Sequence, residues 1–199
     1  MRSYEPIQVN IVTLGEDGCG YSADGRTAVF GALPGETVTA EPVARKRKRL
    51  YCRAVAITNP SADRVTPQCA AANYCGGCSF QHVKHETQLS LKTELLKAAL
   101  GTSQPSSWLA PIVAPTYQYR SKARLGAKFV EKKGRVLVGF REKQKPYIAD
   151  IETCPVLREG AGNLIEPFQS LIAALSNPSS IPQIEIAAGD DDIACIIRH

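Results

Sequence analysis

Residues 7–60 consist of short apolar runs separated by turn residues, with no helical periodicity of useful length. Two of these runs, Glu36–Val43 and Tyr51–Ile57, are rich in β-branched and aromatic residues, which predicts two strands of a hairpin. Several short strands with glycine, proline and aspartate between them are typical of a small β-barrel. We therefore expect an OB-like barrel in residues 1–62.

A helix is predicted over Lys84–Leu100, with Gly101 placed to end it. Its apolar stripe consists of Leu89, Thr93, Leu96 and Leu100. Such a stripe must pack against another surface, which can be the core of this chain or a further domain. Together with the cysteine motif described below, this helix makes up a middle segment, residues 63–101.

A second sheet is predicted after residue 119, where basic and apolar side chains alternate. One face carries Arg120, Lys122, Arg124 and Lys128, and the other carries Ala123, Leu125, Ala127 and Phe129. A turn at 131–134, a helix at about 162–175 and a hairpin at 189–192 follow. The fold class expected is mainly β with some α, in which residues 102–199 form an α+β antiparallel-sheet domain that is interrupted at its C-terminus.

Positive charge is concentrated in two places, although the net charge of +5 alone says little. The predicted hairpin tip has five consecutive cations, Arg45, Lys46, Arg47, Lys48 and Arg49. The basic strand face, with Arg141 beyond it, is the second place. Both suit contacts with RNA phosphates, and a solvated surface that binds nothing is the alternative. Phe140 and Tyr147 are candidates for stacking on an unpaired base, weighed against burial in the core.

The seven cysteines bear on both localisation and chemistry. No signal peptide or membrane-spanning run is visible, so we expect a cytoplasmic protein, whose cysteines would ligate metal rather than form disulfides. Cys69, Cys75 and Cys78 lie close together, and Cys154 is followed by a proline, as in the fourth ligand of many 4Fe-4S sites. The glycines at 76 and 77 would permit close approach and positive φ.

Zinc is the alternative to a cluster, because zinc sites also use a C-x2-C hook, and His82 or His85 could replace a thiolate. Most zinc sites pair two short hooks, however, whereas the second half here is a lone Cys-Pro, which favours the cluster. The remaining cysteines, which lie in strand-like apolar segments, are predicted to be buried small hydrophobes. They are Cys19, Cys52 and Cys195.

Several of these motifs resemble known families. The glycine-rich start, Leu33–Glu36 and the Arg/Lys run resemble a TRAM domain, a module that binds RNA. Cys69–His82 (CAAANYCGGCSFQH) and Ile151–Leu157 (IETCPVL) resemble the cluster motif of the RlmD-type 23S rRNA (uracil-5-)-methyltransferases, and this resemblance extends over essentially the whole chain. It implies 23S ribosomal RNA as partner, S-adenosylmethionine as methyl donor of the parent enzyme, and a 4Fe-4S cluster on Cys69, Cys75, Cys78 and Cys154.

Methyl transfer to uracil C5 needs a nucleophilic cysteine, a base and a site for the methyl donor. None of these can be assigned in this sequence, and it shows no glycine-rich turn of a doubly wound cofactor domain. The chain is therefore predicted to be the RNA-recognition and iron–sulfur portion of such an enzyme, monomeric, without membrane contact, and inactive without a catalytic domain that would follow it. A stand-alone iron–sulfur RNA-binding protein and a zinc-stabilised nucleic-acid-binding module are the alternatives.

Overall fold

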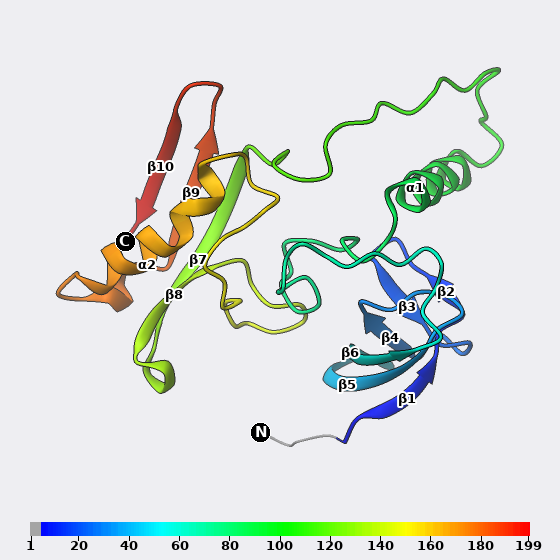
Figure 1. Ribbon diagram of the computed structural model, residues 1–199, viewed down its shortest axis with the longest axis horizontal. Helices are drawn as coiled ribbons and strands as arrows, with labels where there is room; N and C mark the ends of the chain where they lie inside the picture. Colours follow the sequence, from blue (N-terminus) through cyan, green and yellow to red (C-terminus); the bar gives the residue numbers. More distant parts are fainter. Residues whose placement is uncertain (1–4) are drawn as a thin grey trace. The chain divides into compact units, whose positions relative to one another are not determined.

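The computed structural model describes residues 5–199 and divides the chain into two compact units (Figure 1). The first unit comprises the residues up to Asn73 together with Cys78–Val113. The second comprises Tyr74–Gly77 together with Ala114–His199. The segment with the clustered cysteines, residues 69–78, is therefore divided between the units, because its residues Tyr74–Gly77 belong to the second unit. The described residues are mainly β with two α-helices, which confirms the predicted fold class at this level.

Six strands, two of them ten residues long, form a curled sheet in the first unit. They are β1 (Ile7–Asn10), β2 (Thr13–Leu14), β3 (Cys19–Tyr21), β4 (Thr27–Phe30), β5 (Thr37–Lys46) and β6 (Arg49–Thr58). Their order in the sheet is β1-β5-β6-β4-β3-β2, and neighbours are antiparallel except for the parallel pair β4 and β6. Apolar side chains such as Val9, Val29 and Val38 meet in its core. The predicted series of short strands, including the hairpin, is confirmed.

A buried ion pair lies at the edge of this core. Glu36 is 1% exposed, and its carboxylate accepts hydrogen bonds from the backbone N–H groups of Leu33 (2.8 Å) and Ser61 (3.0 Å). The Arg64 guanidinium donates to both carboxylate oxygens at 2.7 Å. Burial acts to raise the pKa of Glu36, but these donors outweigh it and hold the pKa below its ordinary value. The loop after β4 is thereby tied to the segment after β6.

The helix α1 (His85–Leu100) confirms the predicted element. Of the two alternatives for its stripe, the described residues do not show burial in the core of this chain, and contact with a further domain stays a prediction. None of its residues is buried, and Leu96 is 52% exposed. Thr93 interrupts the stripe, and charged or amide side chains fill five of the helix's 16 positions. A helix of this composition can be solvated on all sides. Its N-terminal end is held by the Thr87 hydroxyl, which donates to Asp63 (2.8 Å), and by the Gln88 amide, which donates to the carbonyls of Val83 (2.9 Å) and Phe80 (3.1 Å).

The second unit contains an antiparallel sheet with the order β10-β9-β7-β8. Its strands are β7 (Lys122–Val130), β8 (Arg135–Gly139), β9 (Gln183–Ala188) and β10 (Ile193–Arg198). Along β7, Ala123, Leu125 and Ala127 are buried while Lys122, Arg124 and Lys128 are exposed. The predicted alternation is therefore confirmed. A 3-10 turn, η1 (Glu131–Lys133), joins β7 to β8, as the predicted turn required.

Helix α2 (Ile165–Ala173) packs against β8 and follows the short 3-10 helix η2 (Ala161–Leu164) (Figure 1). A further 3-10 helix, η3 (Pro178–Ser180), leads into β9. The predicted helix is confirmed, although it is shorter than expected. Ile165, Phe168 and Ile172 are its buried residues. Among the described residues, no helix combines the length and the apolar character that crossing a membrane requires.

Candidate functional site

The first basic site lies at the tip of the β5–β6 hairpin. Arg45, Lys46 and Arg49 belong to the strands, and the turn consists of Arg47, with φ of 54°, and Lys48. A groove of ≈ 730 Å³ runs beside this tip. It is lined by Gly25, Arg26, Lys46, Arg47, Lys48, Arg49 and Tyr51. Arg26 and the tyrosine were not predicted, because strand β4 meets β6 in a parallel pairing that local sequence patterns do not reveal.

Contacts with the β3–β4 turn hold the tip in place. The Arg49 guanidinium donates to the Gly25 carbonyl (3.2 Å) and lies 5.0 Å from the centre of the Tyr21 ring. The hydroxyl of Tyr21 donates in turn to Asp17 (2.7 Å), and burial together with this carboxylate raises the pKa of Tyr21. Arg49 is therefore a positioned cation, whereas no described residue forms an ion pair or hydrogen bond with the side chains of Arg47 and Lys48.

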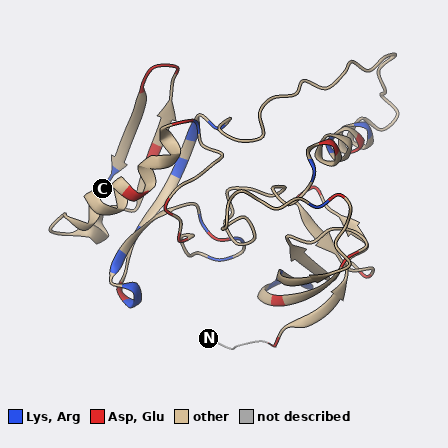
Figure 2. Ribbon diagram, in the orientation of Figure 1, with Lys and Arg blue, Asp and Glu red and all other residues tan. Residues whose placement is uncertain are grey.

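The second basic site lies on the exposed face of the sheet in the second unit. Strand register places residues of β7, β9 and β10 in rows across this face. One row consists of Lys122, Ala187 and Ala194, and the next of Arg124, Glu185 and Ile196. Figure 2 shows the lysine and arginine positions along β7 and at its turn into β8. A groove of ≈ 460 Å³ follows these rows.

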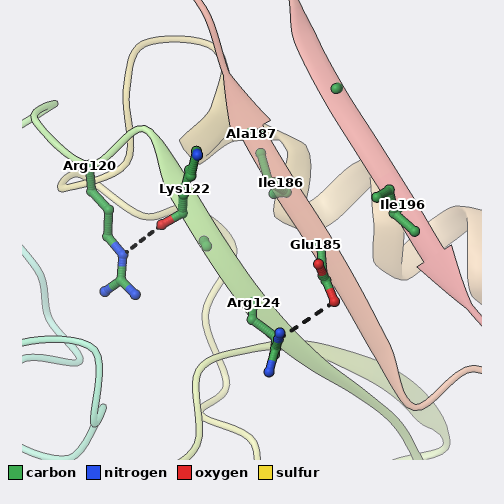
Figure 3. A pocket seen from close by; sticks show the side chains of 9 residues that line it. Arg120, Lys122, Arg124, Glu185, Ile186, Ala187 and Ile196 are labelled. Atoms are coloured by element: carbon green, nitrogen blue, oxygen red, sulfur yellow. Dashed lines mark hydrogen bonds and ion pairs between the residues drawn. The ribbon is translucent and has the colours of Figure 1, made fainter.

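Glu185 lies within this groove and is the residue that the sequence analysis missed (Figure 3). Its Oε1 atom accepts from Arg198 Nε (2.7 Å) and Gln183 Nε2 (2.9 Å) and lies 3.6 Å from Arg124 Nε. The hydrogen bond from Arg198 and the nearby cations lower the pKa of Glu185. The alternation of polar and apolar residues in Gln183–Ala188 is a signal that Glu185 faces outward. Which side chains lie beside it depends on the pairing register of the strands, which the sequence does not display.

Arg120 and Phe140 pack together, although sequence analysis proposed both as separate RNA contacts. Phe140 is 8% exposed, and the Arg120 guanidinium lies 4.7 Å from the centre of its ring. Arg120 also donates to the Lys122 carbonyl (3.0 Å) and, at 3.4 Å, to the Gly77 carbonyl. Phe140 is therefore buried in the core, which was the alternative to stacking on a base. Tyr147 is 50% exposed.

Arg141 and Lys128, the remaining predicted RNA contacts of this unit, are both exposed. The Arg141 guanidinium donates to the Pro146 carbonyl (3.0 Å), which fixes its direction. Lys128 pairs with Leu137 across the β7–β8 ladder, away from the rows that line the groove. The predicted basic side chains thus follow β7 in a line. The groove lies at the end with Arg120, Lys122 and Arg124, and Lys128 lies beyond it.

The hook residues Tyr74–Gly77 pack closely within the second unit. The Gly76 N–H donates to the Arg141 carbonyl (2.8 Å), and the Gly77 N–H lies 3.4 Å from the Cys75 sulfur. A Cβ at Gly76 would lie 2.7 Å from that carbonyl oxygen, and one at Gly77 would lie 2.9 Å from the Phe140 ring. Close approach therefore explains both glycines, but neither has a positive φ, so that part of the prediction is wrong.

Cys154 lies in a tight turn of the same unit. Its N–H donates to the Gly162 carbonyl (3.1 Å), and its own carbonyl accepts from the Leu157 N–H (3.3 Å). A Cβ on Gly162 would lie 2.3 Å from the Cys154 carbonyl oxygen, so glycine is required there. Both Cys75 and Cys154 are buried. The backbone of each is fixed within the second unit, because Cys75 forms a β-bridge with Glu142 and Cys154 is bonded to Gly162.

Cys69 and Cys78 belong to the first unit and are partly exposed. The Cys69 N–H donates weakly to the Gln81 side chain (3.4 Å). His82 is buried, and both ring nitrogens of His85 are buried without a hydrogen-bond partner among the described residues. No three Cys, His, Asp or Glu side chains in residues 5–199 come together as a set that could hold one metal ion.

The other three cysteines were predicted to be buried. Cys19 and Cys52 are buried in the first unit, and burial raises the pKa of the Cys52 thiol to about 11. Cys195 is exposed, so the prediction is wrong for this residue. It lies on β10, an edge strand whose residues are all exposed, and the apolar pattern of that strand did not reveal its position at the edge.

Curated proteins similar to this chain carry the name 23S rRNA (uracil(1939)-C(5))-methyltransferase RlmD. The protein of Alcanivorax borkumensis is 47% identical over 98% of the chain, that of Nitrosococcus oceani 43% over 99%, and that of Alkalilimnicola ehrlichii 42% over 98%. The chain spans 45% of the length of each relative. No family model matches it. The resemblance to RlmD-type proteins is thereby confirmed.

The fold is similar to that of a solved structure. The crystal structure of Pyrococcus abyssi tRNA (uracil-54, C5)-methyltransferase in complex with S-adenosyl-L-homocysteine matches with a TM-score of 0.64. The match covers 96% of this chain and 45% of that chain, at 22% sequence identity. At that identity the likeness concerns the fold alone.

Proposed function

We propose that this chain, a homologue of RlmD-type 23S rRNA (uracil-5-)-methyltransferases over nearly its whole length, is the RNA-recognition and iron–sulfur portion of such an enzyme. The observation that carries the proposal is the 47% identity over 98% of the chain. Because the chain spans under half of each relative, methyl transfer to uracil C5 and the site for S-adenosylmethionine are assigned to the rest of the parent enzyme.

The RNA-binding role is supported by the two basic sites. The tip groove is lined by five cations and no carboxylate, and the sheet groove is lined by three cations around one carboxylate. Both lie on exposed β-structure, where phosphates can approach. Residues 1–62, within the first unit, are proposed to be a TRAM domain that binds 23S ribosomal RNA through its hairpin tip. The second unit binds the same RNA through its sheet face, and the protein acts as a monomer.

A 4Fe-4S cluster is proposed on Cys69, Cys75, Cys78 and Cys154, because four thiols are the donors that such a cluster takes. The local geometry of the second unit fits a thiolate at Cys75, since the Gly77 N–H points to within 3.4 Å of its sulfur. The donors of a single metal ion must all lie within about 2.3 Å of that ion. In a 4Fe-4S cluster, by contrast, each of the four cysteines binds a separate iron. When bound, the cluster would crosslink distant stretches of the chain.

Anaerobic purification tests the cluster. We expect close to four irons and four labile sulfides per chain, and Cys154→Ser should lose both. Cys195→Ser is the matched control, because this thiol is exposed on an edge strand and should leave iron and sulfide unchanged. Stoichiometric zinc without sulfide in the wild-type chain would contradict the assignment and favour a zinc-stabilised module.

Binding to 23S rRNA fragments tests the recognition role. We expect binding whose logarithm falls linearly with the logarithm of the salt concentration, because cations displace counterions from the phosphates. Crosslinking should map to the tip and sheet-face residues. The chain incubated with labelled S-adenosylmethionine and 23S rRNA should transfer no methyl group. Failure to bind would contradict the RNA-recognition role. Methyl transfer by this chain alone would contradict the assignment of catalysis to the rest of the parent enzyme.

A further inference from the structure

We propose that the sheet-face groove of the second unit is a base-reading subsite, in which Glu185 selects an unpaired RNA base with an exocyclic amine over uracil. This inference rests on the proposed RNA-binding function and assigns a substrate class to one of its two surfaces.

The floor of the groove is flat and only weakly polar at its centre. Ala187 and Ala194 lie side by side in one row, and Ile196, which is 56% exposed, lies in the next. Small side chains on adjacent strands leave a level surface on which a planar base can rest, and Ile196 offers it an apolar edge. The groove volume of ≈ 460 Å³ lies within the range of about 300–1,000 Å³ that is usual for ligand sites.

The carboxylate of Glu185 is fixed in place through only one of its oxygens. Arg198, Gln183 and Arg124 all approach Oε1. Among the described residues, none donates a hydrogen bond to Oε2. An ionised carboxylate accepts hydrogen bonds and cannot donate them. Glu185 therefore offers a ligand one anchored acceptor whose direction is set by its other oxygen.

Such an acceptor discriminates between bases. Cytosine and adenine each present an amine donor on their base-pairing edges, and guanine presents an amine beside its ring N–H. Uracil has one ring N–H between two carbonyl oxygens, and their lone pairs repel an anion. A carboxylate aimed at the base edge should therefore favour the three amine-bearing bases.

Charge around the groove favours a nucleic acid over other occupants. Lys122 and Arg124 line one side, Arg124 being 70% exposed, and Arg120 lies at the end. These cations can hold the phosphates on either side of the base. A second copy of the chain is disfavoured, because a symmetric contact would bring two basic faces together.

The test uses the 199-residue chain and pentaribonucleotides that differ only at the central base in an otherwise all-uridine sequence, with binding followed by fluorescence anisotropy. We expect the cytosine, adenine or guanine pentamer to bind about tenfold more tightly than pentauridine, within the range for one good base contact. Glu185→Gln should reduce this ratio to about one, because an amide can donate to a uracil carbonyl as well as accept. Asp190→Asn is the matched control. It removes the same charge from a carboxylate that pairs with Arg158 at 2.8 Å, outside the groove lining, and should leave the ratio unchanged.

The outcomes separate this inference from the proposed function. If the wild-type chain binds all pentamers equally, or if Glu185→Gln keeps the tenfold ratio, the base-reading subsite is refuted while RNA binding stands. If Asp190→Asn abolishes the ratio as Glu185→Gln does, the effect is one of net charge and the subsite is again refuted. Dimerisation through β10, seen as a rise in mass with concentration that Ile196→Lys reverses, would assign the face to a second copy instead. Failure of the wild-type chain to bind any RNA would refute the proposed function itself.

Discussion

The two basic grooves differ in what surrounds their cations. In the hairpin-tip groove of the first unit, the lining consists of arginine, lysine, one glycine and one tyrosine. In the sheet-face groove of the second unit, three cations share the lining with Glu185 and several small or aliphatic side chains. A site of cations alone attracts any phosphate chain, whereas a site with a fixed acceptor and an apolar floor can tell one base from another. Two surfaces of the same sign can therefore contribute affinity and selectivity separately.

The largest expected effect comes from breaking the scaffold that carries the tip. Glu36→Ala leaves Arg64 without its buried partner and should lower the free energy of unfolding of the first unit by about 3–5 kcal/mol. Urea denaturation measures the change, and hydrogen exchange should locate it in β5 and β6 rather than in β7 and β9. Glu41→Gln is the control, because Glu41 pairs with Arg53 at a half-exposed site where solvent screens the charges, and its loss should cost under about 1 kcal/mol.

The same ion pair predicts a pH dependence. The pKa of Glu36 is lower in the folded state than in the unfolded chain, so its contribution is fully present above the unfolded pKa. As pH falls through the lower folded pKa, the contribution is lost. Stability of the first unit should therefore decrease on acidification below about pH 4, and Glu36→Gln should flatten that dependence. An unchanged acid profile in Glu36→Gln would contradict the role given to the pair.

The contribution of the tip is tested by neutralising its two turn cations. Arg47→Asn with Lys48→Gln should weaken binding to every RNA sequence by about tenfold, or ~1.4 kcal/mol, and reduce the log–log salt slope by about 1.4 for single strands. Titrations at several salt concentrations measure both quantities. Lys122→Gln with Lys128→Gln removes the same charge from β7 and provides the comparison. A sequence-dependent loss in the tip variant would contradict the assignment of general phosphate binding to that groove.

A smaller effect is expected at the β7–β8 turn. Asp150 accepts from Arg135 (2.7 Å) and from Lys133, and although burial acts to raise its pKa, these cations lower it. Asp150→Asn should destabilise the second unit by about 1 kcal/mol at neutral pH. The difference from wild type should shrink below the unfolded carboxyl pKa and vanish as pH falls through the lower folded pKa, because the Asp150 carboxyl is then protonated in both states. Asp191→Asn, at an exposed hairpin, is the control for thermal unfolding measured across this pH range.

The smallest expected effect concerns Arg120. Arg120→Lys keeps the charge but loses the planar group that stacks on Phe140, so we expect a loss of about 0.5–1 kcal/mol in the stability of the second unit. Thermal unfolding measures it, with Arg141→Lys as a matched control whose guanidinium contacts a carbonyl at 3.0 Å. Equal losses of stability in the two variants would show that stacking of Arg120 on Phe140 does not add to the stability of the second unit.

Local patterns in the sequence were sufficient for the strands, both helices and the two concentrations of positive charge. Period-two alternation along β7 separated its buried alanines from its exposed lysines, because neighbouring strand residues point to opposite faces. The cysteine spacing suggested four candidate ligands, and their assembly around one cluster stays a prediction. These inferences depend on the nearest neighbours along the chain, which the sequence displays directly.

Other features depended on which strands pair and in what register. The parallel pairing of β4 with β6 brings Arg26 beside the tip, and the β7–β9 register sets Glu185 opposite Arg124. Burial of Phe140 and exposure of Cys195 follow from their places within the unit, whereas an aromatic or a cysteine in a strand looks the same at an edge as at a centre. Amino-acid order therefore specified what each strand is, and three-dimensional packing specified its neighbours, because contacts between residues far apart in the chain arise only on folding.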